Sequence, residues 1–323
     1  MTEPRIAVFR SLAQVPAAFG PSVAAIGNFD GVHCGHREIL SAVVAEARTL
    51  GAKAVAITFD PHPEQFLRPD KAPGLLSPIA ERLRLLASTG IDAVLVLPFD
   101  AALAQLRARA FVEQVLVGAL NVRGLHEGGN FRFGVRAEAG IAELRSFGAE
   151  FGFAVHVHPA LHIHGLEVSS SAIREALAAG DMRRARWMLG RPFAVTAHQQ
   201  RDRGVGSRLV VPTVNLSEYE GLLPAFGVYI TRIAIDGRWF RAVTNIGNRP
   251  TFAGAGFSVE TYILNFEPVE LTAETRIDLA FLLRLRSERA FPSPEALKAQ
   301  ILRDVARAQR YFRLAAPALQ AQA

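Results

Sequence analysis

Residues 26–36 read Ile26-Gly27-Asn28-Phe29-Asp30-Gly31-Val32-His33-Cys34-Gly35-His36, and this stretch decides the fold of the first half of the chain. An apolar strand, Ser22–Ile26, leads into it. The apolar spacing then predicts a helix over Arg37–Leu50 that Gly51 ends. Glycines allow close backbone approach, and the N-terminal end of a helix attracts anions. His33 and His36 add donors at that end, so the stretch predicts a phosphate site that contains no lysine.

Strand and helix patterns alternate through the rest of this half. We expect strands at Ala54–Phe59, Ala93–Leu97 and Val155–His158, with helices around Pro78–Thr89 and Arg109–Leu120. Such alternation is typical of a parallel sheet with right-handed crossovers and helices on both faces. Ligands bind such sheets beyond the carboxyl ends of the strands, which is where the histidines lie.

The pattern changes after Val195 to short strands separated by turns. Strands are predicted at Val228–Ile235, Phe240–Asn245, Val259–Phe266 and Ile277–Leu285, the first two joined by the hairpin signal Asp236-Gly237. A closing helix, Ser293–Phe312, places four apolar residues on one face: Leu297, Ile301, Val305 and Ala308. This half is expected to form an antiparallel β-barrel with a C-terminal helix.

Composition excludes several classes of protein. The chain has 323 residues, a net charge of +6 and one cysteine, so it is long enough for two cores and has no internal disulfide framework. Charges interrupt every long apolar stretch, and no signal peptide is evident, so we expect a cytoplasmic protein without a membrane span. Arginines are spread along the chain rather than gathered in one stripe, which disfavours a nucleic-acid partner. The sequence leaves the oligomeric state open.

Three further segments carry polar groups suited to ligand binding. The first is Thr58-Phe59-Asp60-Pro61-His62-Pro63, after the second strand; the second is Gly128-Gly129-Asn130-Phe131-Arg132-Phe133-Gly134; the third is Val168-Ser169-Ser170-Ser171-Ala172-Ile173-Arg174, before a helix that Gly180 ends. Each also has a purely structural interpretation: a proline-stiffened loop, a Phe-rich turn and a serine helix cap, respectively. Likewise His33 and His36 could merely cap a glycine-rich turn. Zinc bound by His33, Cys34 and His36 is disfavoured, because no complementary ligands lie at metal spacing.

The glycine- and histidine-rich stretch resembles the HxGH signature of the nucleotidylyltransferases. Its longer form and the three further segments, in this order, resemble prokaryotic bifunctional riboflavin kinase/FAD synthetases. The resemblance implies a Rossmann-like nucleotidylyltransferase domain that transfers AMP from ATP to FMN. The residues implied for this step are His33, His36 and Arg174 in catalysis; Gly27, Asn28, Phe29, Asp30, Gly35, Ser169, Ser170 and Ser171 in ATP binding; and Phe59, Pro61, His62, Asn130 and Phe131 in flavin binding.

The second half is similar to riboflavin kinases. Val211-Pro212-Thr213-Val214-Asn215-Leu216 matches a segment in which Thr213 and Asn215 would hold Mg²⁺ with ATP. Glu260 matches the base that activates the ribityl hydroxyl, and Arg286 a flavin-binding position. The implied substrates are ATP, FMN and riboflavin. The resemblance places the first domain at 1–188, the second, riboflavin-kinase-like domain at 189–314, and a disordered tail at 315–323.

The glycine-rich segment before Pro212 departs from the kinase pattern. Ala197, Asp202 and Val210 stand where glycines are expected, and only Gly206 remains. Substituted glycines restrict backbone approach to the triphosphate, and Asp202 would repel it. We therefore expect weaker riboflavin phosphorylation than FMN adenylylation. The alternatives are an FAD synthetase whose second domain only binds flavin, and a non-catalytic flavin or nucleotide sensor.

Overall fold

The computed structural model describes residues 6–198, 208–209, 213–216, 219–251, 254–265, 269–270 and 275–320. Asp202, Gly206 and Val210, on which the expectation about the kinase rests, lie outside these residues, as do Val211 and Pro212. The chain forms two compact units, residues 1–170 and 171–323. No helix in the described part of the chain combines the length and hydropathy that a membrane span requires.

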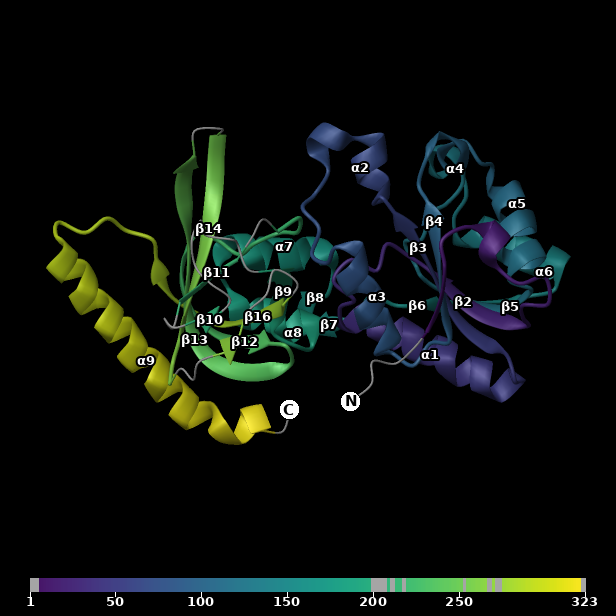
Figure 1. The fold of residues 1–323 in the computed structure, drawn as a ribbon. Helices are drawn as coiled ribbons and strands as arrows, with labels where there is room; N and C mark the ends of the chain where they lie inside the picture. The colour runs from purple at the N-terminus through teal and green to yellow at the C-terminus, as the bar shows by residue number, and fades with distance from the viewer. Residues whose placement is uncertain are drawn as a thin grey trace. The chain divides into compact units, whose positions relative to one another are not determined.

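The first unit is built on a six-stranded parallel sheet (Figure 1) with the order β1-β4-β3-β2-β5-β6. Its strands are β1 (Ala7–Phe9), β2 (Ser22–Ile26), β3 (Lys53–Asp60), β4 (Ala93–Pro98), β5 (Val122–Gly128) and β6 (Ala154–His158), followed by the hairpin β7 (His162–Ile163) and β8 (Leu166–Glu167). The order reverses between β2 and β5. Ligands bind at this switch point in open α/β sheets.

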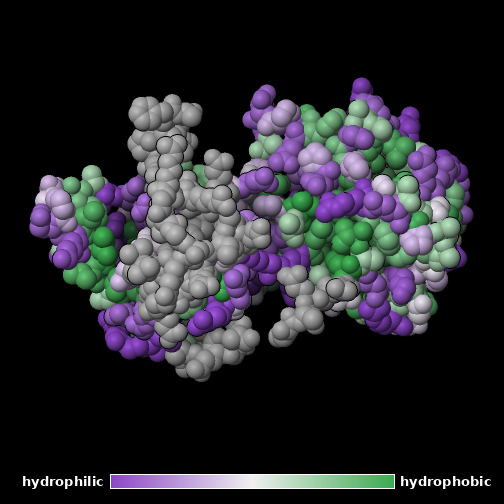
Figure 2. All heavy atoms as spheres, viewed as in Figure 1, coloured by the Kyte–Doolittle hydropathy of each residue, from purple (hydrophilic) through white to green (hydrophobic). Residues whose placement is uncertain are grey.

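Helices cover both faces of this sheet and enclose two cores. They are α1 (Cys34–Leu50), α2 (Pro63–Leu67), α3 (Ile79–Ala87), α4 (Ala101–Ala104), α5 (Ala108–Phe111), the π-helical segment η3 (Val112–Ala119) and α6 (Ile141–Phe151); short 3-10 turns occupy Leu12–Gln14, Pro69–Lys71 and Val135–Ala137. Apolar residues of α1 and α3 pack on one face, and those of α5, η3 and α6 on the other. On the surface of this unit that faces the viewer, apolar side chains gather near the middle among hydrophilic ones (Figure 2).

Three features of the first unit differ from our expectations. Helix α1 begins at Cys34, three residues before the predicted start, because His33 caps it. The central strand β5 was not predicted, since Val122–Gly128 contains Arg123, His126, Glu127 and two glycines rather than an apolar run. Helix α6 was likewise missed. The predicted end of α1 at Gly51 is confirmed, because that glycine adopts the left-handed conformation, with φ of 61°.

The second unit is a curled antiparallel sheet with helices, which confirms the predicted fold class. The sheet order is β11-β14-β13-β12-β16-β9, and in the described residues it forms a half-barrel rather than a closed barrel (Figure 1). Its elements are α7 (Ser170–Ala179), α8 (Met182–Leu189), β9 (Phe193–His198), β10 (Arg208–Leu209), β11 (Thr213–Asn215), β12 (Gly227–Ile235), β13 (Arg238–Thr251), β14 (Gly254–Ile263), β15 (Val269–Glu270), β16 (Arg276–Ser287) and α9 (Pro294–Gln320).

The start and the end of the second unit can be compared with the boundaries predicted from the sequence. Helices α7 and α8 group with the second unit, although the sequence placed the boundary at 188/189. Helix α9 continues to Gln320, beyond the start of the tail expected from Ala315. The functional boundary between the domains stays a prediction.

Candidate functional site

The first candidate site lies at the switch point, where His33 and His36 stand at the start of α1. The Nδ1 atom of His33 accepts a hydrogen bond of 3.3 Å from the N–H of His36. The two rings stack with 3.6 Å between their centroids. This confirms that His33 caps the helix, and it places the proton of the neutral His33 ring on Nε2. Capping and ligand binding therefore use different nitrogens of His33.

The His36 ring is held in an apolar setting. Its Nδ1 atom is buried and has no hydrogen-bond partner among the described residues. The Phe29 ring packs edge-on against it at 5.2 Å. Burial above all, together with the nearby His33 and Arg82, holds the pKa of His36 well below its ordinary value. His36 is therefore neutral near pH 7 in the free protein, with a polar atom ready for a ligand.

The turn from β2 to α1 is tightly held. Phe29 and Val32 have left-handed backbones, with φ of 47° and 37°, a conformation that costs of order 1–3 kcal/mol and clusters at functional sites. Gly27 donates to the Ile57 carbonyl at 3.0 Å, and the Thr58 hydroxyl donates to the Asn28 carbonyl at 3.2 Å. These bonds fix the backbone that faces the ligand.

Asp30 and Ser170, both expected near ATP, hold this turn through hydrogen bonds. The Asp30 carboxylate accepts from the N–H groups of Leu76 and Ser77 at 3.0 and 2.9 Å. The Ser170 hydroxyl donates to the Asp30 carbonyl at 2.9 Å. The observed contacts of these two side chains are thus architectural.

The predicted flavin-binding residues near the end of β3 differ in their positions relative to the cavity. Phe59 lines a cavity, but Pro61 is exposed and His62 is buried. The Nδ1 atom of His62 accepts from the Glu64 N–H at 3.2 Å and caps α2. His62 and Pro61 are not among the residues that line the cavity. The observed contact of His62 is structural, and a part for Pro61 and His62 in flavin binding stays a prediction.

Two adjacent cavities form the site. The larger, of about 810 Å³, has an aromatic lining that includes Phe59, Phe99 and Phe131. The smaller, of about 400 Å³, is lined by His33, His36, Asn130 and Ser169. Ile26, Gly27 and Phe131 line both cavities. A ligand with a flat apolar ring at one end and phosphates at the other fits this pairing, since aromatic walls suit the ring and N–H donors the phosphates.

Other residues predicted for this site are placed less directly. Asn28 and Gly35 line the larger and the smaller cavity, respectively. Ser171 is exposed and Arg174 is half-buried on α7, and both group with the second unit. Their part in phosphate binding stays a prediction.

The sequence analysis overlooked one buried acid of this site. Glu127 lines the smaller cavity, and its carboxyl group accepts from the Ile26 N–H at 2.7 Å. Burial raises the pKa of Glu127 well above its ordinary value. The sequence around Glu127 does not indicate this burial, because the strand that contains it was not predicted.

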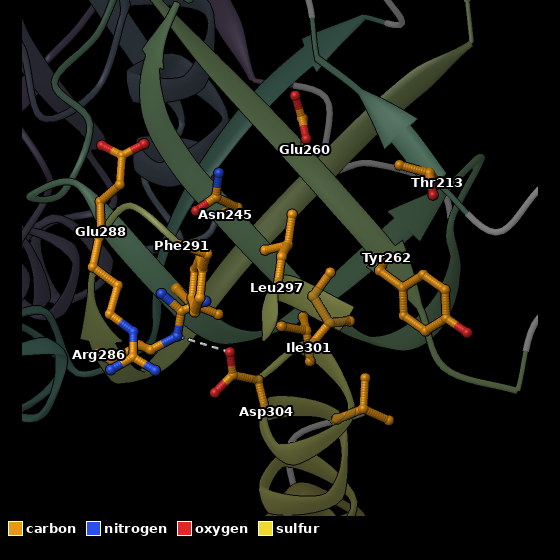
Figure 3. A pocket seen from close by; sticks show the side chains of 14 residues that line it. Thr213, Asn245, Glu260, Tyr262, Arg286, Glu288, Phe291, Leu297, Ile301 and Asp304 are labelled. Atoms are coloured by element: carbon orange, nitrogen blue, oxygen red, sulfur yellow. Dashed lines mark hydrogen bonds and ion pairs between the residues drawn. The ribbon is translucent and has the colours of Figure 1, made fainter. Parts of the chain in front are cut away.

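The second candidate site is a cavity of about 440 Å³ in the second unit (Figure 3). Glu260 on β14 is the register partner of both Asn215 on β11 and Asn245 on β13. Side chains of register partners share a face of the sheet, so these three lie together. The Oδ1 atom of Asn215 is buried and has no hydrogen-bond partner among the described residues.

This arrangement suits Mg²⁺ and ATP. The amide oxygen of Asn215 and the hydroxyl of Thr213, which lies two residues away on the same face, are oxygen donors of the kind that Mg²⁺ takes. Because the Asn215 oxygen has no partner among the residues that the structure describes, it suits a bound cation. Glu260 is exposed within the cavity lining and has room for a substrate beside it.

The opposite wall of this cavity comes from β16 and α9. Arg286, a predicted flavin-binding residue, lines the cavity and forms a 2.8 Å ion pair with the buried Asp304 (Figure 3). The sequence placed Leu297, Ile301 and Ala308 on one apolar face of the terminal helix. Leu297 and Ile301 are 41% and 45% exposed and line the cavity, whereas Ala308 is fully buried. An apolar face on a helix looks the same in sequence whether it meets a core or a ligand cavity.

Comparisons with known proteins agree with both sites. The FAD synthetase family model matches residues 16–172, and the riboflavin kinase model matches residues 189–312. A bifunctional riboflavin kinase/FMN adenylyltransferase of Pseudomonas fluorescens is 38% identical over 296 residues, covering 91% of this chain and 93% of the relative. Its counterpart in Escherichia coli K12 is 35% identical, covering 92% and 94%.

A solved structure supports the fold along nearly the whole chain. A crystal structure described as a macrolide-efflux protein from Streptococcus pneumoniae matches with a TM-score of 0.82 and 25% identity, covering 94% of this chain and 98% of that one. The two family models, the curated relatives and the order of the motifs all agree. The chain belongs to the bifunctional riboflavin kinase/FMN adenylyltransferase family.

Proposed function

We propose that this enzyme makes FAD from riboflavin in two ATP-dependent steps, one in each unit. The observation that carries the proposal is the pair of adjoining cavities at the switch point, one aromatic and one with histidine donors, together with a second cavity around Glu260. Membership of the family supplies the identity of the substrates.

In the adenylylation step an FMN phosphate oxygen attacks the α-phosphorus of ATP, and the bond to pyrophosphate breaks. The enzyme acts by positioning the substrates and by stabilising negative charge. His33 donates from Nε2 and His36 from its imidazole to the phosphates, with Ser169, Ser171 and Arg174 as further contacts. The backbone of Gly27–Asp30 lies against the nucleotide, and Phe59, Phe131 and Asn130 hold the flavin.

In the kinase step the terminal ribityl hydroxyl of riboflavin attacks the γ-phosphorus of ATP. Glu260 takes the hydroxyl proton. Thr213 and Asn215 would hold Mg²⁺, which neutralises charge on the ATP phosphates. Arg286, oriented by Asp304, borders the flavin. The altered segment that contains Asp202 and Val210 supports our expectation that this step is the slower of the two.

The test is an assay of both steps at matched enzyme concentration with Mg-ATP, in which FMN is measured from riboflavin and FAD from FMN. His36→Ala should lower FAD formation by about 10²–10³, the typical effect of one lost charge-stabilising donor, and leave FMN formation unchanged. Glu260→Gln should do the reverse. The step that each variant keeps shows that the loss is confined to one activity, and circular dichroism establishes that the substituted unit is folded.

Cys34→Ala is the matched control beside the two histidines, because the chemistry uses imidazoles and no thiol. Both activities should persist in it. Full FAD synthesis by a folded His36→Ala protein would refute the assignment of the transferase site. Equal turnover of the two steps in the wild type would show that the altered segment does not slow the kinase.

A further inference from the structure

Three histidines and one glutamate gather on a face of the parallel sheet beside the smaller cavity. His126 on β5 and His156 on β6 are register partners, and their rings stack with 4.6 Å between centroids. His158 follows two residues later on β6 and therefore lies on the same face. Glu46 projects from α1, which packs against β5. The proposed functions assign none of these four side chains a role.

The ligand atoms converge. One carboxylate oxygen of Glu46, Oε2, lies 2.5 Å from His126 Nε2 and 3.2 Å from His156 Nε2. Tetrahedral zinc sites have bonds of about 2.0–2.1 Å to such atoms, which places neighbouring ligand atoms roughly 3.3 Å apart. The contact between Glu46 and His156 already has this spacing. The contact between Glu46 and His126 needs to lengthen by only about 1 Å, within the range of a small side-chain adjustment.

The surroundings match those of a metal centre. The other nitrogen of His126, Nδ1, lies 2.9 Å from His158 Nε2. Metal-binding histidines regularly have such an outer partner, which fixes their tautomer and orientation. Gly124 makes room for the carboxylate, because a Cβ atom there would lie 2.7 Å from Glu46 Oε1.

The site is also reachable. The His126 side chain is 6% exposed, whereas that of His156 is 45% exposed, so one side opens to solvent.

We propose that Glu46, His126 and His156 bind one transition-metal ion of the zinc class, with His158 as the outer partner that orients His126. Two imidazoles and a carboxylate suit such an ion better than Mg²⁺, which prefers oxygen ligands alone. The open side leaves a coordination position for water. The ion would tie α1, which begins with the catalytic histidines, to β5 and β6.

The metal site borders the cavity proposed for the ATP phosphates, because His126 and His158 line the smaller cavity, but none of its proposed ligands has a role in the ATP-dependent steps. The sequence analysis found no ligands at metal spacing, because the three ligands come from different elements. Glu46 and His126 are 80 positions apart. The spacing of neighbouring residues in the sequence therefore does not indicate this site.

The test uses the untagged full-length chain after treatment with a chelator. Calorimetry with Zn²⁺ should show one tight equivalent, and Co²⁺ should give visible absorption bands of a nitrogen–oxygen site without thiolate charge transfer. Glu46→Gln, which keeps the shape of the side chain, and His156→Asn should each weaken Zn²⁺ binding by at least about 100-fold. His158→Asn should weaken it by roughly 10–100-fold, as the loss of an outer partner does.

The controls are His162→Asn, an exposed histidine outside the cluster, and Cys34→Ser, and both should bind as the wild type does. Circular dichroism establishes that every variant is folded. The proposal is overturned if the wild type binds no Zn²⁺, if Glu46→Gln and His156→Asn bind it unchanged, or if binding depends on Cys34. These readouts are independent of FMN and FAD synthesis, so the failure of one proposal does not imply the failure of the other.

Discussion

At the scale of single residues, the first site depends on where two imidazoles keep their protons. The cap formed by Nδ1 of His33 leaves Nε2 as its donor, and burial keeps His36 neutral near pH 7. Burying His36 as a neutral ring costs little free energy while no ligand is bound. When an anion binds, the ring gains a favourable interaction with it.

This predicts proton uptake when Mg-ATP binds. The pKa of His36 is lowered in the free protein, and a bound phosphate raises it, so between these two pKa values binding transfers a proton from the buffer to the ring. Calorimetry at pH 6 in buffers of different ionisation enthalpy should therefore give net uptake, which disappears in His36→Asn. Uptake that is equal in wild type and variant would assign the proton to another group.

At the scale of elements, the loops after β3 depend on one buried cation. Arg82 on α3 is 1% exposed and donates to the carbonyls of Phe59 and Ser77 at 3.0 and 3.4 Å. Desolvation lowers its pKa, while the nearby carboxylates of Asp30 and Asp60 act in the opposite direction. Arg82 thus ties α3 to the end of β3, which carries Phe59, and to the segment around Ser77 that Asp30 holds.

We expect Arg82→Met to lower the free energy of unfolding of the first unit by about 2 kcal/mol. Each carbonyl left unpaired costs about 1–3 kcal/mol, partly offset because no charge is then buried. FAD formation should also fall in Arg82→Met, because the segment around Phe59 is then held less firmly. The control is Arg84→Met on the same helix, whose ion pair with Glu81 is half-exposed and worth at most about 1 kcal/mol. Denaturant unfolding measures both, and equal effects would contradict the role of Arg82.

At the scale of the whole molecule, the chain holds two units with separate cores. The parallel sheet is packed on both faces, whereas the curled sheet packs against α9 through residues that include Ala308 and Phe312. Units with their own cores usually unfold as separate cooperative steps.

Calorimetric unfolding should therefore show two transitions that respond to different substitutions. Arg82→Met should lower the midpoint of one only. Phe312→Ala should lower only the other, because this buried ring fills the second core and its loss typically costs about 3–5 kcal/mol. A single transition that both substitutions shift would show that the units unfold together.

The sequence by itself determined the family, the fold class and the local elements built from neighbouring residues. The strand Ser22–Ile26, the end of α1 at Gly51 and the hairpin at Asp236-Gly237 follow from apolar periodicity and turn chemistry. These signals are local, because they report on residues within a turn or a strand of one another.

Only the tertiary structure decided what depends on distant partners. It made His62 the cap of α2, placed Leu297 and Ile301 along a cavity, and inserted β5 at the switch point despite its polar residues. It also brought Glu46 to His126 and His156. The physical reason is that such positions are set by the packing of elements far apart in the chain, and no pattern of neighbouring residues encodes which elements will meet.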